Sequence, residues 1–185
     1  MDDKARYSDP ELVKGCVEGK PQFQKALFDR YAPVMYPVCI RYVGREVAQD
    51  VLQDGFITVF DKLGTYKGEG SLEGWIRRIM VNTALMELRK NSATKNAEDI
   101  DEVPVAELGY QSHGVLDEIS AKELMKVIEK MPEGFRSIFN LFVLDGYSHA
   151  EIAQMLGITE LSSRSQLSRA RTWLQTRLKK LYDKR

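Results

Sequence analysis

Histidine and cysteine are scarce in this sequence, and their scarcity excludes several kinds of chemistry. Its 185 residues include two histidines and two cysteines. Cys16 and Cys39 lack the spacing of metal ligands and lie in apolar helical patterns, so we expect buried free thiols. The sequence has neither a paired nucleophile and base nor a phosphate-binding loop. We therefore expect a protein that is not an enzyme, with no catalytic residue, metal site or cofactor.

Long hydrophobic runs are also missing. No apolar stretch approaches the roughly 20 residues of a membrane-spanning helix, and no secretory signal segment precedes the first helical pattern. Free thiols are typical of a reducing compartment. We expect a cytoplasmic protein with no membrane insertion.

The chain has no net charge, although its charges are unevenly distributed. It contains 27 basic and 27 acidic residues. Residues 1–90 carry a net charge of +1, residues 91–123 carry −6 and residues 124–185 carry +5. Residues 92–118 show little helical periodicity and hold one basic residue, Lys95, against seven acidic ones. This composition favours a mobile acidic linker between two units.

Helical spacing of apolar residues dominates the first unit, without strand-like alternation. The predicted helices span residues 9–19, 23–42, 47–63 and 71–91. Asp9 is expected to cap the first helix and Ser71 the fourth. Pro33 and Pro37 are candidates for a bend in the second. The sequence therefore predicts a four-helix N-terminal domain.

A helix-turn-helix is predicted near the end of the chain. Ser148 and Glu151 form a capping box, and Gly157 suits the left-handed position that ends a helix. Ser162 or Ser163 is expected to cap the following helix. The apolar stripe of that helix comprises Leu167, Ala170, Leu174, Leu178 and Leu181. A helix placed in this way can enter the major groove of DNA.

The outer face of this last helix is polar and basic. At 100° per residue, the positions opposite the stripe and on its flank are Arg164, Ser165, Ser168, Arg169, Thr172 and Thr176. Residues 162–185 hold eight basic residues and one acidic residue, which attracts phosphate. A solvated amphipathic helix closing a bundle is the alternative, and the capped helix and glycine turn before it favour DNA binding.

These patterns together predict an all-α protein. Two small helical domains, residues 1–91 and 119–185, are joined by a flexible acidic linker at residues 92–118, and the C-terminal domain contains the helix-turn-helix.

Two blocks of the sequence resemble a known family, the sigma factors of bacterial RNA polymerase. The segments similar to region 2 of the extracytoplasmic-function (ECF) group of the sigma-70 family are residues 29–31, 50–56, 68–76 and 82–84. Those similar to region 4 are residues 131–136, 146–153 and 168–171. The resemblance implies a promoter-directing sigma factor, in which region 2 binds the polymerase clamp and melts and reads the minus-10 element, and region 4 reads the minus-35 element.

The resemblance, with the residue types, implies three sets of site residues. The polymerase-binding set is Asp50, Gln53, Asp54 and Phe56. The minus-10 set, in and after a loop with three glycines at 64–70, is Tyr66, Lys67, Arg77, Arg78 and Asn82. The minus-35 set is Ser162, Arg164, Ser165, Ser168, Arg169 and Arg171. Trp75 shares a face with apolar residues and is expected in the core.

The implied partners are core RNA polymerase, through its clamp and flap, promoter DNA and an anti-sigma factor, and we expect a monomer when the protein is free. Two segments depart from the family pattern: the connection at residues 43–46 looks a residue tighter than usual, and the entry to the last helix differs. Leu161, Ser162 and Ser163 stand where many members have Gly-Thr-Val, so the turn lacks glycine and one packing position is polar. The alternative function is a stand-alone helix-turn-helix regulator with an N-terminal ligand-sensing bundle, which requires dimerisation and an apolar ligand cavity.

Overall fold

The computed structural model describes residues 7–94 and 120–182, which belong to two compact units. Within these residues every regular element is helical, which confirms the predicted all-α class. The acidic linker predicted at residues 92–118 lies almost entirely outside the described residues. Its mobility and the domain boundaries at residues 91 and 119 stay predictions.

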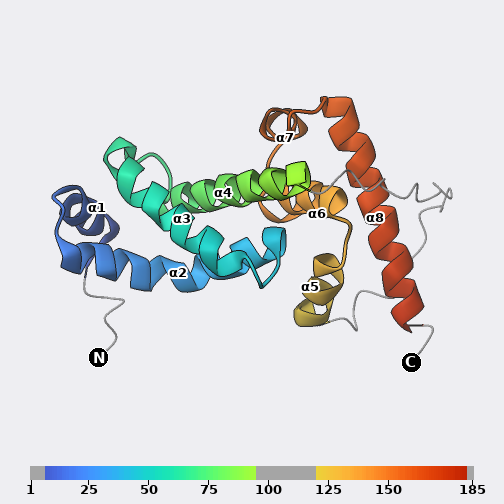
Figure 1. The fold of residues 1–185 in the computed structure, drawn as a ribbon, viewed down its shortest axis with the longest axis horizontal. Coiled ribbons are helices and arrows are strands. Elements are labelled where there is room, and N and C mark those ends of the chain that lie inside the picture. The colour runs from blue at the N-terminus through green and yellow to red at the C-terminus, as the bar shows by residue number, and fades with distance from the viewer. Residues whose placement is uncertain (1–6, 95–119, 183–185) are drawn as a thin grey trace. The chain divides into compact units, whose positions relative to one another are not determined.

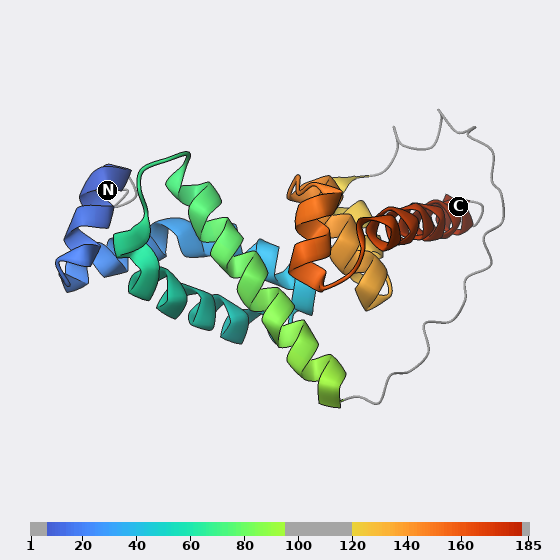
Figure 2. The same cartoon turned by 90° about the horizontal axis from the view of Figure 1, so that it is seen from above.

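Four α-helices and a short 3-10 helix make up the described part of the first unit (Figure 1). Their bounds are α1 (Asp9–Val17), α2 (Pro21–Val43), α3 (Ala48–Lys62), η2 (Leu63–Thr65) and α4 (Leu72–Thr94). The helices α2, α3 and α4 pack against one another, and Figure 2 shows α4 running diagonally across α2. Side chains that this packing buries completely include Leu27, Met35, Val59, Ile76 and Met80.

The caps and ends of these helices depart in part from the prediction. Ser8, and not Asp9, caps α1, because Ser8 and Glu11 form a capping box one residue earlier. Ser71 caps α4 as predicted, since its Oγ accepts a hydrogen bond from the backbone N–H of Gly74 at 3.0 Å. The fourth helix continues to Thr94, past the predicted end at residue 91. Pro33 and Pro37 both lie within α2, which remains one helix.

Asp9 joins α1 to α2 instead of capping α1. Its Oδ1 accepts a hydrogen bond from the Tyr31 hydroxyl at 2.7 Å and lies 2.9 Å from Nη1 of Arg30. Burial and the hydrogen bond to Asp9 raise the pKa of Tyr31. Arg30 and Tyr31, which belong to one of the segments that resemble region 2, therefore have a structural role in this unit.

Both cysteines are buried and free, as the sequence predicts. Burial raises the pKa of the Cys16 and Cys39 thiols to about 11. Thiols with so high a pKa carry almost no thiolate at neutral pH and are inert. They act as small apolar side chains in the core.

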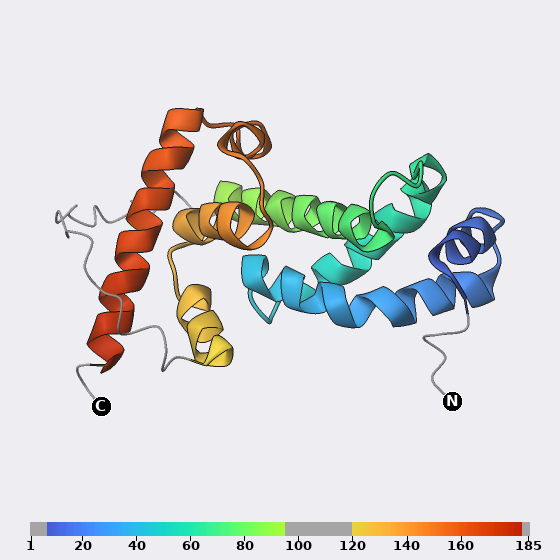
Figure 3. The same cartoon turned by 180° about the vertical axis from the view of Figure 1, so that it is seen from behind.

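The second unit is built along its last helix. Its elements are α5 (Ala121–Glu129), α6 (Glu133–Phe139), the π-helical segment η4 (Asn140–Leu144), α7 (His149–Leu156) and α8 (Glu160–Tyr182). α5, α6 and α7 all contact α8. Figures 1 and 3 show α7 beside the N-terminal end of α8 and α5 nearer to its C-terminal end. The long helix is thereby held from one side, and its residues Arg164, Ser165, Ser168 and Arg169 are exposed.

The apolar stripe of α8 is largely as predicted. Leu167, Ala170, Leu174 and Leu178 are buried, whereas Leu181 is 51% exposed. Leu181 lies in the last turn of the helix, one residue before its end at Tyr182. The prediction that Leu181 is buried was therefore wrong.

Candidate nucleic-acid and polymerase interface

The helix-turn-helix forms as the capping residues predict. The Ser148 Oγ accepts from the backbone N–H of Glu151 at 3.2 Å, and the Glu151 carboxylate accepts from the backbone N–H of Ser148 at 2.9 Å. Gly157 ends α7 with a φ of 68°, a left-handed value that favours glycine. The backbone N–H of Ile158 then donates to the Ala153 carbonyl, which closes the turn before α8.

The start of α8 differs from the prediction. The helix begins at Glu160, and Thr159 caps it by accepting a hydrogen bond from the backbone N–H of Ser162 at 3.0 Å. Ser162 instead accepts from Nε2 of Gln166 at 3.0 Å, and Ser163 is completely buried. Neither serine is the N-cap, because Thr159 offers a hydroxyl three residues earlier. Residues 161–163, which contain no glycine, therefore lie in the first turn of α8.

Ser163, the polar residue at this packing position, has a hydrogen-bonding partner. The Oγ of Ser163 lies 2.9 Å from Nδ1 of His149, the first residue of α7. The His149 ring also stacks on Phe142, with centroids 4.4 Å apart and an interplanar angle of 24°. Partial burial and the nearby guanidinium of Arg164 lower the pKa of His149. This contact fixes α7 against α8 where many family members would place valine.

Five of the six predicted minus-35 residues are exposed on α8: Arg164, Ser165, Ser168, Arg169 and Arg171. Ser162, the sixth, is half-buried and already hydrogen-bonded. Arg164 pairs with Glu160 at 3.4 Å, and both side chains are more than half exposed. Such a surface ion pair is worth only about 0–1 kcal/mol, so the guanidinium can be redirected to a ligand. The guanidinium carbon of Arg171 lies 5.9 Å from the Phe142 ring centroid.

The predicted polymerase-binding residues divide into an exposed group and a buried residue. Asp50, Gln53 and Asp54 are exposed on one side of α3. Phe56 is only 2% exposed, and its ring centroid lies 4.7 Å from that of Phe28. Since Phe56 packs in the core, it positions α3 and cannot itself contact a partner in this structure. Its assignment to the binding surface is corrected accordingly.

One apolar residue on the same side of α3 was missed. Ile57 is 60% exposed and lies seven residues after Asp50 and three after Asp54, a spacing that places all three on one helical face. We call Asp50, Gln53, Asp54 and Ile57 the α3 face. The helical spacing from Asp50 was the signal that could have identified it.

The Tyr66 side chain already makes two contacts within its own unit. Its hydroxyl donates to the Gly70 carbonyl at 2.8 Å, and its ring centroid lies 5.6 Å from the ring of Trp75. Trp75 is half-buried, so it was wrongly placed in the core. Gly68 and Gly70 have φ values of 78° and 76°, which the loop needs in order to bend back on itself. Lys67, between these contacts, is exposed.

On α4, the predicted residues lie on two sides. Arg78 and Asn82 are exposed one turn apart, on the same face. Arg77 is 31% exposed and pairs with Glu73 at 3.0 Å, so it is set back from that face. Met86, four residues after Asn82, is 66% exposed and was not predicted. We call Tyr66, Lys67, Arg78 and Asn82 the loop surface.

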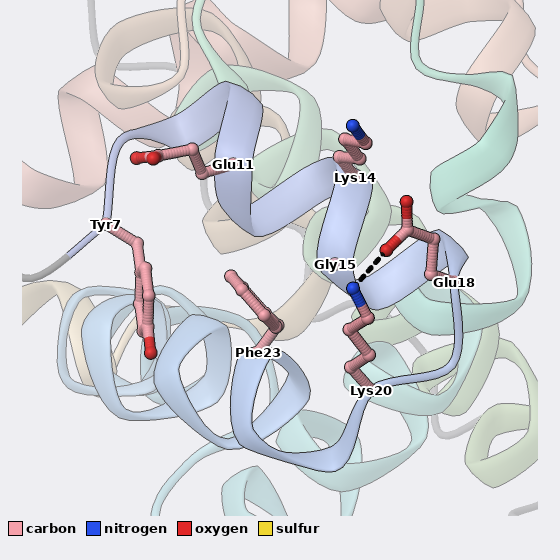
Figure 4. Close-up of a pocket in the computed structure, with 7 residues that line it drawn as sticks. All are labelled: Tyr7, Glu11, Lys14, Gly15, Glu18, Lys20 and Phe23. Atoms are coloured by element: carbon pink, nitrogen blue, oxygen red, sulfur yellow. Dashed lines mark ion pairs between the residues drawn. The ribbon is translucent and has the colours of Figure 1, made fainter.

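A pocket between α1 and the start of α2 is open and lined mostly by polar or charged residues, with the Lys20 ammonium 2.6 Å from the Glu18 carboxylate (Figure 4). Among the described residues, no three metal-ligating side chains gather to hold an ion. No helix in the described part of the chain is long and apolar enough to cross a membrane.

Comparison with known families decides what this arrangement belongs to. The profile of Sigma-70 region 2 matches residues 27–94, and that of Sigma-70 region 4 matches residues 121–174. The chain belongs to the sigma-70 family. Region 2 of this sigma factor thus covers most of α2 and all of α3 and α4, and region 4 covers α5 to α7 and most of α8.

Similar proteins indicate which group of the sigma-70 family the chain belongs to. The chain is similar to the ECF RNA polymerase sigma-E factor of Escherichia coli K12, with 29% identity covering 95% of this chain and 97% of that protein. The sigma-E factor of Haemophilus influenzae is 27% identical, with 95% and 98% covered. These matches support the ECF group over nearly the full length.

A solved structure shares the fold. This sigma factor is similar to RpoE from Bartonella quintana, solved in complex with the anti-sigma factor NepR, with a TM-score of 0.53 and 21% identity. The likeness covers 84% of this chain and 96% of that one. At this identity it supports the fold alone.

Proposed function

We propose that this sigma factor directs core RNA polymerase to specific promoters and helps to melt the minus-10 element, through three surfaces of its two regions. The presence of both Sigma-70 regions, in order and over most of the chain, carries the proposal. A stand-alone regulator would account for region 4 but not for region 2. The open pocket between α1 and the start of α2, which is lined mostly by polar or charged residues, gives the ligand-sensing alternative no support.

The α3 face binds the polymerase clamp in this proposal. Asp50 and Asp54 present two exposed carboxylates, and Ile57 adds an exposed apolar side chain beside them. Charged groups around an apolar contact give an interface its orientation and its speed of association. Phe56 supports the face from beneath by anchoring α3 on Phe28.

The loop surface reads the melted minus-10 strand. Lys67 and Arg78 offer positive charge to the phosphate backbone, and Asn82 offers donors and acceptors to a base edge. The Tyr66 ring is half-buried, so the part that remains exposed is available for stacking. The bond from its hydroxyl to Gly70 holds the loop in place before DNA arrives.

The exposed side of α8 reads the minus-35 element. Its N-terminal turns carry Arg164, Ser165, Ser168 and Arg169, and the first turns of a recognition helix are those that enter the major groove. Arg can bond guanine with two hydrogen bonds, and Ser can address bases or phosphates. Region 4 also contacts the polymerase flap, and an anti-sigma factor restrains the free, monomeric protein.

Reconstitution with core polymerase tests the proposal. The full chain mixed with core enzyme is expected to give promoter-specific run-off transcription, whereas the free chain binds duplex DNA weakly, because its net charge is zero. The double variant Asp50→Asn, Asp54→Asn should assemble holoenzyme less well. Glu18→Gln, which neutralises an exposed carboxylate away from α3, is the matched control. Tight, promoter-specific binding by a dimer of the free chain would favour the regulator instead.

A further inference from the structure

The N-terminal turn of α8 carries an apolar side chain that the fold does not use. Leu161 is 77% exposed, the highest value among the large exposed hydrophobic residues of the described chain. Because α8 begins at Glu160, Leu161 belongs to the helix and not to the turn before it. Its direction is therefore set by the helical backbone.

Leu161 lies at the centre of the exposed side of α8. At 100° per residue it is about 20° from Ser168, about 40° from Ser165 and about 60° from Arg164 around the helix axis. All three of these side chains are exposed. The buried residues Ser163, Leu167 and Ala170 lie on the other side. Any surface that meets the three polar residues also meets Leu161.

We propose that Leu161 contacts the methyl group of a thymine in the upstream promoter element and sets the preference for thymine at that position. This inference rests on the proposed reading of the minus-35 element by α8. In the major groove, the thymine C5-methyl is the apolar group that distinguishes base pairs. A leucine side chain has no donor or acceptor, so it can discriminate bases only through that group.

Duplex DNA fits this residue better than a protein partner does. The neighbours of Leu161 on this side are an arginine and two serines, whereas Ile57, the exposed apolar residue of the α3 face, lies beside two carboxylates, which repel phosphate. Arginine and serine match phosphates and base edges. Leu161 then supplies the apolar part of a mixed readout of one base sequence.

Removing the methyl group alone provides the sharpest test. Holoenzyme carrying the full chain would first select upstream elements from a randomised duplex library, with the wild-type chain and with Leu161→Ala. The wild type is expected to select thymine at one position where the variant does not. In the selected promoter, deoxyuridine in place of that thymine keeps every hydrogen-bonding group and removes only the methyl.

The effects of the two changes on binding, deoxyuridine for thymine and Leu161→Ala, should not be additive. Deoxyuridine should weaken wild-type binding roughly 3- to 10-fold, as expected for the loss of a buried methyl contact, and should leave binding by Leu161→Ala unchanged. Leu181→Ala removes an exposed leucine from the other end of α8 and should keep the full sensitivity to deoxyuridine. Alanine favours helix, so the fold of α8 should survive both changes.

Other outcomes overturn the inference in distinguishable ways. Equal deoxyuridine effects in wild type and Leu161→Ala would show that Leu161 does not contact the methyl group. Reduced holoenzyme assembly by Leu161→Ala, without any change in base preference, would place Leu161 against polymerase. If Arg164→Ala and Arg169→Ala also left upstream discrimination intact, then the proposed role of α8 itself would fail.

Discussion

The Nδ1 atom of His149 and the Oγ of Ser163 lie 2.9 Å apart, and this contact joins the two helices of the helix-turn-helix. Ser163 is completely buried, so its hydroxyl requires a partner within the protein. His149 provides that partner while its ring stacks on Phe142. Together the two residues replace an apolar packing contact with a directional one, which orients α8 relative to α7.

This pair should be energetically coupled. Ser163→Ala is expected to lower the free energy of unfolding of region 4 by about 0.5–1.5 kcal/mol, the net value of one hydrogen bond. In the background of His149→Ala the same change should cost clearly less. The two tryptophans, Trp75 and Trp173, lie in different regions, so urea unfolding followed by Trp173 fluorescence in a Trp75→Phe background isolates region 4. Additive losses would show that the hydrogen bond contributes nothing.

Region 4 should become less stable as the pH falls. Burial and the charges of Arg164 and Arg171 lower the pKa of His149, while Glu160 opposes them. Because the folded state then binds the His149 proton less readily than the unfolded state, stability is lost as pH falls from the unfolded pKa of about 6.5 through the lower folded value. Urea midpoints at pH 7.5 and 5.5 measure the loss, which should be smaller in His149→Gln. An equal loss in that variant would assign the effect to other groups.

The contact between α1 and α2 gives a prediction for the first unit. Tyr31→Phe removes the hydroxyl that donates to Asp9 and should cost about 0.5–1.5 kcal/mol. Lys25→Ala, which breaks an exposed pair with Asp29, should cost less than about 0.5 kcal/mol and serves as the control. Urea unfolding followed by Trp75 fluorescence in a Trp173→Phe background reports both values. Equal costs would indicate that Asp9 does not stabilise the junction.

Much of the fold could be predicted because the apolar spacing is strongly helical. The capping box at Ser148 and the glycine at 157 located the helix-turn-helix correctly. Two predicted helix caps were wrong because neighbouring side chains compete for the same backbone N–H groups. Ser8 caps α1, where Asp9 was predicted, and Thr159 caps α8, where Ser162 or Ser163 was predicted.

The candidate surfaces were harder to predict than the fold. Phe56 shares its motif with the exposed residues Asp50, Gln53 and Asp54, yet its register on α3 places it in the core. Ile57 and Leu161 are apolar and therefore resemble core residues in a sequence, although both are exposed. Only the packing of the other helices shows which side of α3 and α8 remains open.

The basic residues of α8 should separate into two functional groups. Arg164→Ala and Arg169→Ala should each cost about 1–3 kcal/mol of discrimination for the upstream element, because they lie in the turns proposed to enter the groove. Lys179→Ala and Lys180→Ala, near the helix C-terminus, should weaken binding evenly across sequences and reduce its salt dependence. Holoenzyme affinities for matched and mismatched promoters at several salt concentrations test this. Equal, sequence-independent losses from all four changes would contradict it.

The loop surface gives the last prediction, in which the ring and the hydroxyl of Tyr66 have separate roles. The hydroxyl donates to Gly70 and holds the loop, whereas the exposed part of the ring is available to a base. Tyr66→Phe keeps the ring and should reduce open-complex formation only slightly. Tyr66→Ala with Lys67→Ala removes both stacking and charge. Since stacking is worth roughly 1–3 kcal/mol per base, this pair should markedly impair open-complex formation on duplex promoters.

Permanganate footprinting measures the opening of a duplex promoter, and holoenzyme affinity measures binding to a pre-melted one. A promoter already melted at the minus-10 element should rescue only the melting part of the defect, because the contacts of Tyr66 and Lys67 with the single strand are still missing. Glu69→Gln, a change at an exposed position of the same loop that is not part of the loop surface, is a control for general disturbance of the loop. If the double variant bound single-stranded non-template DNA as tightly as the wild-type holoenzyme does, Tyr66 would be a structural residue that packs on Trp75, and the reading of the strand would have to lie with Arg78 and Asn82.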